Sequence, residues 1–175
     1  PVCYEGEAAP DLAEVAATLG IDQAAVIALH SGTEYLVYML GFLPGFPFMG
    51  DLPERLRLPR RSQPRVRVPA GSVAIATGLT AIYPWESPGG WQLLGRCPVP
   101  LFDARRASPS LLAAGDKVRF TPVSADECRA LEAGLAAETA IGGCGRWKGL
   151  RIVPMPSSGT TKSLSVTSQC LPWIS

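Results

Sequence analysis

A single histidine is the side chain in this sequence best suited to acid–base chemistry. His30 lies at the predicted end of a helix, where the helix dipole favours its protonated form, and an imidazole can titrate near neutral pH. It is a candidate catalytic acid or base, although a lone histidine is more often structural. One histidine cannot build a histidine-rich metal site, and no G-x-S-x-G turn supports a serine triad.

Six of the sixteen basic residues are arginines that lie between positions 55 and 67. Guanidinium groups bind carboxylate or phosphate through paired hydrogen bonds, which would suit a small acid, a carboxylated intermediate or the phosphates of ATP. The alternative is an ordinary solvated face. Because the chain has a formal net charge of only +1 and the cluster lacks interleaved aromatic residues, nucleic acid is not favoured as a partner.

A glycine- and aromatic-rich segment and two turns complete the candidate site. The segment from Gly41 to Gly50 reads G-F-L-P-G-F-P-F-M-G and either caps the core or lines a pocket or a partner interface. Turns near Ser72 and Ser87 can present hydroxyl and backbone N–H groups to an oxyanion, or they are ordinary hairpin turns. The sequence lacks G-x-x-x-x-G-K-[ST] and G-x-G-x-x-G, so a standard nucleotide-binding loop is absent.

Short strands and three helices are predicted to position these residues. Helices are expected from Pro10 to Gly20, from the N-cap Asp22 through Ser31 with Gly32 as the left-handed C-terminal residue, and over 124–139. Strands are expected at 2–4, 33–41, 65–68, 72–76, 81–83, 91–95 and 117–122. This close spacing, with 18 Gly and 17 Pro, predicts a mainly β fold with flanking helices and a small closed barrel.

The composition narrows the class of protein. Five cysteines without a C-x-x-C pair argue against a disulfide framework or a zinc site, and indicate reduced thiols in the cytoplasm. The apolar run from Tyr35 to Met49 is interrupted by glycine and proline, so no membrane-spanning helix is predicted. The second helix has no basic face for DNA. Residues 1–139 are expected to form one domain, and 140–175 a linker or disordered tail.

Four segments in order resemble one family closely. They are L-H-S-G, Y-L-V-Y-M-L-G-F-L-P-G-F-P-F-M-G, P-R-R-S-Q-P-R-V-R-V-P-A-G-S-V and I-Y-P-W-E-S-P-G-G-W-Q-L-L-G-R. Over residues 1 to 137 the chain is similar to the family that contains the 5-oxoprolinase B subunit and allophanate hydrolase subunit 1. The same family includes the matching part of the carboxyltransferase domain of urea carboxylases and a sporulation-kinase inhibitor.

The resemblance implies a cyclophilin-like closed β-barrel with flanking helices. It also implies two partners, the C subunit of 5-oxoprolinase and a third, lactam-utilisation subunit, with which the complex uses ATP to open 5-oxoproline to glutamate. Two alternatives remain open: a non-catalytic histidine-kinase inhibitor module, and a carboxyltransferase component of a urea carboxylase or allophanate hydrolase system.

The family motif also implies roles for individual residues. His30 would act as an acid or base or bind substrate, and Arg60 and Arg65 would hold an anionic group. Polar contacts to substrate or phosphate would come from Ser72, Tyr83, Ser87, Gly89 and Gly90. The pocket or subunit interface would be shaped by Phe42, Pro44, Gly45, Phe46 and Trp91.

Three departures from the family pattern stand out. The N-terminal subdomain of the family is not in this sequence. Leu79 and Ala81 stand where the family has glutamine and glycine, so a polar side chain is lost and a residue with positive φ is replaced. After Ala140 the family resemblance ends, although the segment from Gly149 to Val153 is similar to the opening strand of the partner subunit.

Overall fold

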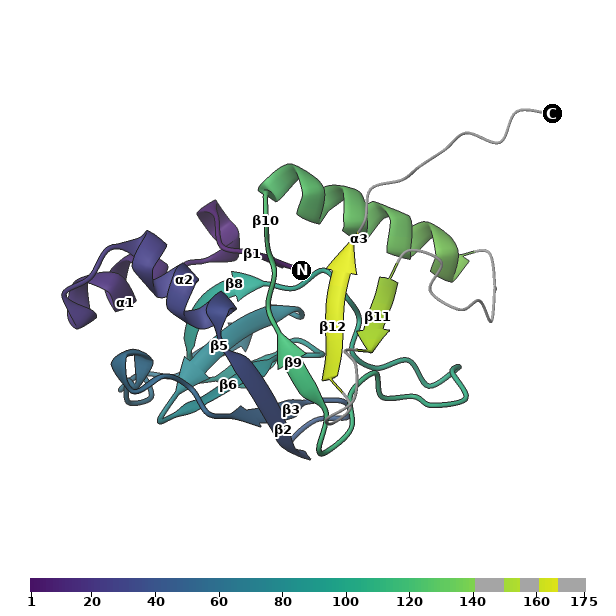
Figure 1. The fold of residues 1–175 in the computed structure, drawn as a ribbon, viewed down its shortest axis with the longest axis horizontal. Coiled ribbons are helices and arrows are strands. Elements are labelled where there is room, and N and C mark those ends of the chain that lie inside the picture. The colour runs from purple at the N-terminus through teal and green to yellow at the C-terminus, as the bar shows by residue number, and fades with distance from the viewer. Residues whose placement is uncertain (141–149, 155–160, 167–175) are drawn as a thin grey trace.

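The computed structural model describes residues 1–140, 150–154 and 161–166 of the chain. Two sheets and three α-helices make up this part (Figure 1). The strands of the large sheet are β1 (Val2–Cys3), β2 (Glu34–Leu40), β3 (Pro47–Gly50), β5 (Ser72–Ala76), β6 (Leu79–Ile82), β8 (Gln92–Arg96), β9 (Lys117–Arg119), β10 (Pro122–Val123), β11 (Leu150–Pro154) and β12 (Thr161–Val166). A separate ribbon pairs β4 (Arg65–Val68) with β7 (Ser87–Gly89).

The large sheet is curled but open. Its strand order is β10-β1-β8-β5-β6-β3-β2-β9-β12-β11, with β10 and β11 at the two ends. Every strand of a closed barrel has a neighbour on both sides, whereas each end strand here pairs on one side only. The mainly β class with flanking helices is confirmed, and the closed barrel is not.

Each helix begins or ends at a residue that explains its position. Helix α1 (Leu12–Leu19) stops at Gly20, whose φ of 65° lies in the left-handed region. Helix α2 (Gln23–Gly32) starts where the Asp22 carboxylate accepts a hydrogen bond from the Ala25 N–H at 2.6 Å. The prediction that Gly32 follows the helix as its C′ residue is wrong, because Gly32 is the last residue of α2 and has no positive φ.

Helix α3 (Ala125–Ala140) starts with the expected capping box. The Glu127 N–H donates to Ser124 Oγ at 3.2 Å, and the Ser124 N–H donates to Glu127 Oε2 at 2.9 Å. The Glu127 carboxylate accepts hydrogen bonds from the backbone N–H and the hydroxyl of Ser124, and both lower its pKa. The 3-10 turns η1 (Gly6–Ala8) and η2 (Glu54–Leu56) complete the helical elements.

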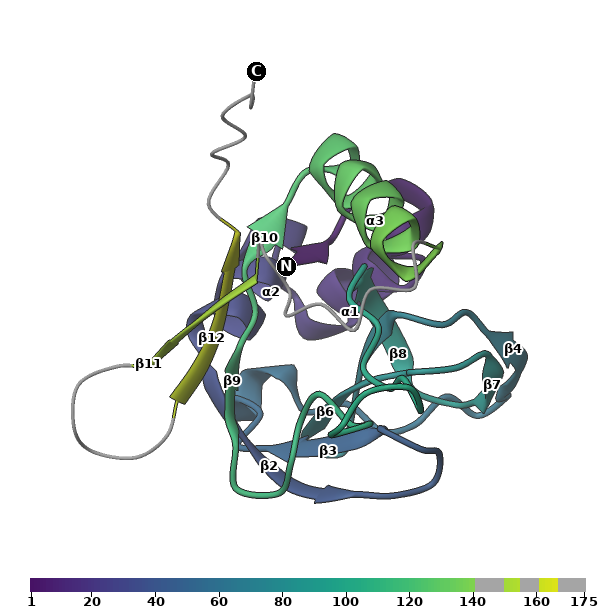
Figure 2. The ribbon, with the colours of Figure 1, turned by 90° about the vertical axis from the view of Figure 1, so that its right-hand side faces the viewer.

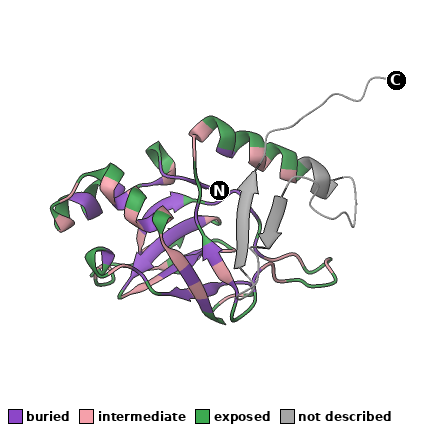
Figure 3. Cartoon of the chain, in the orientation of Figure 1, coloured by how far each residue is buried: buried purple, intermediate pink, exposed green. Residues whose placement is uncertain are grey.

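The main core lies between one face of the sheet and the helices. Val73 and Ile75 of β5 point into it and pack with apolar residues of α1 such as Val15. The alternate residues Ala74 and Ala76 belong to a second apolar cluster, because successive strand residues face opposite sides of a sheet. Figure 3 shows burial concentrated in the strands and exposure on the outer faces of the helices. The sheet is therefore buried on both faces around β5.

Before α3, two strands were not predicted from the sequence. Strands β3 and β7 fall in segments rich in glycine and proline, which indicate turns. The predicted strand over 117–122 is divided into β9 and β10. Strand β11 falls on the stretch similar to the partner's opening strand, and β12 pairs with β9. The other residues after 140 lie outside the described residues, so the linker or tail assignment stays a prediction.

Three cysteines in the described part of the chain, Cys3, Cys97 and Cys128, are buried free thiols. In the same part, no single helix is long and apolar enough to cross a membrane. Helices α1 and α2 pass that test only together, as a pair bent by 96°.

Candidate functional site

The second apolar cluster is an aromatic layer between the large sheet and the β4–β7 ribbon. It consists of Phe46, Val68, Ala74, Ala76, Ala81, Tyr83, Trp91 and Leu93. Phe46 is at its centre, with ring centroids 5.1 Å from Tyr83 and 6.2 Å from Trp91, both edge to face. Figure 2 shows the ribbon at the right-hand edge of the molecule, beyond β8.

The glycine-rich loop before β3 places one aromatic ring inside this layer and one outside. Gly45 has a φ of 77°, and a Cβ there would lie 2.8 Å from Phe102 Cβ, so this position requires glycine. Phe46 is buried, whereas Phe42 packs on its edge and remains 66% exposed. The carbonyl oxygen of Pro44 accepts a hydrogen bond from Trp85 Nε1 at 3.2 Å. The loop therefore buries Phe46 in the aromatic layer and leaves Phe42 exposed.

Arg60 and Arg65 lie at the rim of the aromatic layer in different electrostatic settings. The Arg60 guanidinium carbon lies 5.9 Å from the centre of the Trp91 ring, a cation–π distance, and the residue is exposed. No ion pair with a described acidic residue involves Arg60. Arg65, in contrast, donates from Nη2 to Asp11 Oδ1 at 2.5 Å. Arg60 is thus the more available cation for an external anion.

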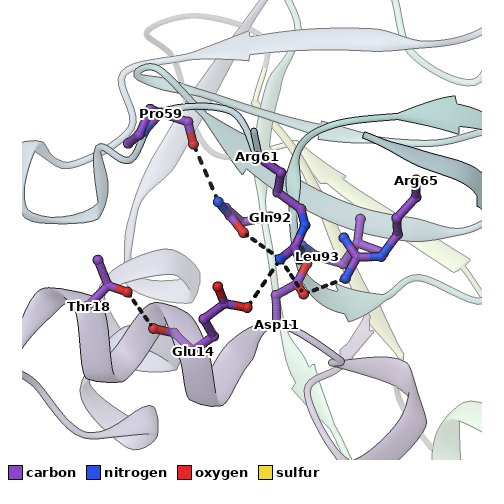
Figure 4. Close-up of polar contacts among 8 residues, drawn as sticks. All are labelled: Asp11, Glu14, Thr18, Pro59, Arg61, Arg65, Gln92 and Leu93. Carbon is purple, nitrogen blue, oxygen red and sulfur yellow. Dashed lines mark hydrogen bonds and ion pairs between the residues drawn. The ribbon is translucent and has the colours of Figure 1, made fainter. Parts of the chain in front are cut away.

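Asp11 is the centre of a buried ionic network (Figure 4). Its Oδ1 also accepts from Arg61 Nη1 at 3.1 Å, and its Oδ2 accepts from the Leu93 N–H at 2.6 Å. The same Arg61 nitrogen donates to Glu14 Oε2 at 3.2 Å. The network connects the start of α1 to β8 and to the arginine segment. Asp11 was not predicted as part of the site, because its position in the sequence indicated only a helix start.

A surface cleft borders this network. It has a volume of about 390 Å³. It is lined by Glu14, Val15, Thr18, Leu58, Pro59, Arg60, Arg61, Ser62, Gln63 and Gln92. The cleft is therefore lined by an acidic side chain, Glu14, and by two basic ones, Arg60 and Arg61. Arg60 also contacts the aromatic layer through Trp91.

His30 lies in the main core, away from solvent. It is fully buried and stacks on Phe120 at a centroid distance of 4.6 Å. Thr80 uses its hydroxyl proton on the Ala74 carbonyl, so it must accept from His30 Nε2 at 3.0 Å. Nδ1 is then unprotonated and accepts from the Tyr4 hydroxyl at 2.8 Å.

This environment keeps the imidazole neutral. Burial lowers the pKa of His30 to about 3, because the surrounding core offers no water to a charged ring. Both ring nitrogens are occupied by Tyr4 and Thr80. The geometry thus favours a structural role for His30 over the acid–base role expected from the sequence. Thr80 was not singled out from the sequence, although it lies in the same motif as Tyr83.

Several predicted site residues meet around the ribbon. The Arg61 N–H donates to the Gly90 carbonyl at 2.7 Å, and Gly89 packs against the Tyr83 hydroxyl. Ser72 contacts Tyr83 only through the backbone in this set of hydrogen bonds, because the Ser72 carbonyl accepts from the Tyr83 N–H at 2.9 Å. The residues brought together are Phe42, Phe46, Arg60, Arg65, Tyr83, Ser87, Gly89, Gly90 and Trp91. His30 is not among them.

The two departures in β6 have a structural explanation. Ala81 is an ordinary buried strand residue, so the expectation of a positive φ at this position is wrong. Leu79 packs against the aromatic layer. Within the described residues, no group of three or more His, Cys, Asp or Glu side chains is arranged to hold a metal ion.

Comparisons with known proteins show the family of the chain. Residues 1–112 match the family model described as carboxyltransferase domain, subdomain C and D. The chain is 52% identical over 128 residues to the B subunit of 5-oxoprolinase from Escherichia coli O157:H7, covering 73% of this chain and 59% of the relative. It thus spans about three fifths of that relative's length.

Two solved structures are also similar. A conserved uncharacterized protein from Pyrococcus horikoshii is 46% identical with a TM-score of 0.71, covering 73% of this chain and 59% of the other. Urea carboxylase of Kluyveromyces lactis is 28% identical with a TM-score of 0.59, covering 70% of this chain and 12% of the other. With the family model matching well over half of its length, the chain belongs to the carboxyltransferase domain, subdomain C and D, family.

Proposed function

We propose that this chain is the B subunit of an ATP-dependent 5-oxoprolinase, which opens the ring of 5-oxoproline to glutamate. Its partners would be a protein like the C subunit of that enzyme and a third lactam-utilisation subunit, in the cytoplasm. Support comes from three relatives, each named as the B subunit of 5-oxoprolinase, at 52% identity. The observation that carries the proposal is the gathering of the family-motif residues around one aromatic layer with Arg60 at its rim.

Each part of that layer has a role in the proposal. Arg60 attracts the anionic substrate, and Phe46 and Trp91 exclude water from it. Phe42, exposed beside them, contacts the partner that resembles the C subunit. His30 holds Tyr4 and Thr80 in place and so supports the site from the core.

We assign ATP to the partner subunits. The sequence has neither G-x-x-x-x-G-K-[ST] nor G-x-G-x-x-G, the glycine loops that commonly bind nucleotide phosphates. No step of ATP hydrolysis is therefore assigned to residues of this chain.

The test combines the chain with its two partner subunits, ATP and 5-oxoproline, and measures glutamate. Arg60→Ala is expected to lower the rate by about tenfold or more, because a charged hydrogen-bonding group is lost from the site. Arg67→Ala is the matched control, since Arg67 is exposed and pairs only with Glu86 among the described residues. Its rate should match that of the unmodified chain.

Other outcomes of the same experiment identify the alternatives. Absence of glutamate in the complete mixture would contradict the proposal, and tight binding to a histidine kinase would then favour the inhibitor module. The second candidate is a urea carboxylase component, favoured by the similarity to the Kluyveromyces lactis enzyme. It predicts carboxyl transfer to urea from a biotin-carrying partner.

A further inference from the structure

The surface cleft between α1 and residues 58–63 is large enough for a small metabolite. Its volume is about 390 Å³. Ligand pockets in proteins usually measure about 300–1,000 Å³. Val15 and Leu58 give the cleft an apolar part, while Thr18, Ser62 and Gln63 are among the polar residues that line it. The cleft thus combines apolar contact with polar groups on two walls, as binding sites for small molecules do.

The α1 wall of the cleft offers hydrogen-bond acceptors. Glu14 and Thr18 are four positions apart and lie on the same face of the helix. The Thr18 hydroxyl donates its proton to the Glu14 backbone carbonyl at 2.8 Å, so its oxygen can only accept from a ligand. The Glu14 carboxylate uses Oε2 to accept from Arg61, and Oε1 has no hydrogen bond to a described residue. This wall suits a positively charged group with several N–H donors.

The opposite wall carries hydrogen-bond donors. Arg61 makes its side-chain hydrogen bonds to Asp11, Glu14 and Gln92 through Nη1, as Figure 4 shows. Its Nη2 donates to none of the described residues, so it is available to a ligand. Ser62 is exposed on the same wall and has a hydroxyl to donate. A guanidinium edge next to a hydroxyl suits a carboxylate.

The balance of charge makes a simple ion a poor ligand for the cleft. The two cations of its lining, Arg60 and Arg61, are matched by the Glu14 carboxylate and by Asp11, which is buried and paired with Arg61. An anion is attracted by the arginines but repelled by Glu14, and a cation experiences the reverse. A molecule with an ammonium group and a carboxylate satisfies both walls at once.

We propose that this cleft binds a free amino acid, with its ammonium group on Glu14 and Thr18 and its carboxylate on Arg61 and Ser62. The class of ligand rests on the two walls alone. Its identity as glutamate rests on the proposed function, in which ring opening turns the uncharged amide nitrogen of 5-oxoproline into an ammonium group. The cleft therefore binds the product of that reaction and not its substrate.

Direct binding to the full chain tests the cleft without any turnover. Titration calorimetry compares L-glutamate with glutarate, which has the same two carboxylates and no ammonium group, and with L-5-oxoproline. We expect binding of L-glutamate only, because the other two compounds bring no cation to Glu14 and Thr18.

Two variants of the α1 wall identify the site. Glu14→Gln and Thr18→Val should each weaken the binding of L-glutamate by about tenfold, because each removes an acceptor for a charged group. Both residues are exposed, so the fold should be retained, which circular dichroism checks. Glu86→Gln is the matched control, since Glu86 is also an exposed acid paired with an arginine, Arg67, and does not line the cleft. Its affinity should equal that of the unmodified chain.

The outcomes separate this proposal from the enzymatic one. Glutarate binding as tightly as L-glutamate, no binding at tens of millimolar, or unchanged affinity in both α1 variants would overturn the amino-acid site. If the complete mixture forms glutamate while the chain shows one of these results, only the cleft proposal fails. If L-glutamate binds through Glu14 and Thr18 but the complete mixture forms no glutamate, the amino-acid site stands and the 5-oxoprolinase function is rejected.

Discussion

At His30, the surroundings rather than the residue type decide the chemistry. An isolated imidazole titrates near pH 6.5, but this ring is fully buried, stacked on Phe120 and bonded at both nitrogens. Burial makes the protonated ring less stable than the neutral ring, so the imidazole does not take up a proton near neutral pH. A buried neutral histidine has a measurable signature in the pH dependence of folding.

We expect the unfolding free energy to fall as the pH drops from 6.5 to about 3. The unfolded chain binds a proton at His30 in this interval and the folded chain does not, so the unfolded state gains. Above pH 6.5 the contribution of His30 is fully present. The limiting slope is about 1.4 kcal/mol per pH unit. Urea denaturation at a series of pH values measures it.

His30→Gln and His30→Ala provide the comparison. Both should lack this part of the pH dependence. Ala should also lose about 2–4 kcal/mol, because it leaves a cavity and two unpaired hydroxyls, whereas Gln can retain hydrogen bonding. A variant whose pH profile matches the original chain would show that His30 is not the group responsible.

The sequence predicted the polar residues of the site better than their roles. Arg60, Tyr83, Ser87 and Trp91 lie around one aromatic layer, and their roles in binding stay predictions. The burial of His30 could not be predicted, because it depends on Phe120, distant in sequence, packing over the ring. The same applies to Asp11, whose partners lie about fifty or more positions away.

At the scale of elements, the Asp11 network fixes α1 to β8 and to the arginine segment. Three donors converge on one carboxylate that is 2% exposed. Removing this buried acid would deprive the Arg65 guanidinium and the Leu93 N–H of the partner described for them, while Arg61 would keep Glu14.

Asp11→Ala is therefore expected to destabilise the fold by about 3–5 kcal/mol. The measurement is the urea midpoint at neutral pH, monitored by circular dichroism. Glu86→Ala is the matched control, because Glu86 pairs with Arg67 at the exposed surface, where such pairs contribute about 0–1 kcal/mol. Equal effects of the two substitutions would contradict a stabilising role for the Asp11 network.

Elements with strong local signals were predicted well. Asp22 and the Ser124–Glu127 box mark helix starts, and β4 and β5 have the predicted bounds. Strand β7 was missed because S-P-G has turn chemistry, and its strand geometry comes from pairing with β4. The open sheet was not predicted, since closure depends on how distant edges meet.

At the scale of the molecule, the described buried residues of the two apolar clusters run from Val2 to Phe120, and Leu135 packs against the larger cluster. A chain ending at Ala140 should therefore unfold cooperatively in thermal denaturation, because it keeps all the buried residues described in both clusters. Loss of cooperativity would show that the segment after 140 is part of the domain.

The same shortened chain is expected to change locally at β9. Strand β12 pairs with β9 through Lys117, Val118 and Arg119. Without it, backbone amides on that side of β9 should exchange faster with solvent, while those facing β2 remain protected. Hydrogen exchange measured by NMR distinguishes the two sides. Unchanged protection along the whole strand would contradict the pairing.

The pairing of β1 also sets the order in which the protein can be completed during synthesis. Val2 and Cys3 pair with Pro122 and Val123 on one side, and Cys3 with Arg96 on the other. The ribosome releases β1 long before these partners, so this strand waits with its edges open until almost the entire domain has emerged. Such distant pairing slows folding and exposes the nascent chain to aggregation. Strand β1 is thus secured only after Pro122 and Val123 have been made, and until then it is a segment that chaperones could shield.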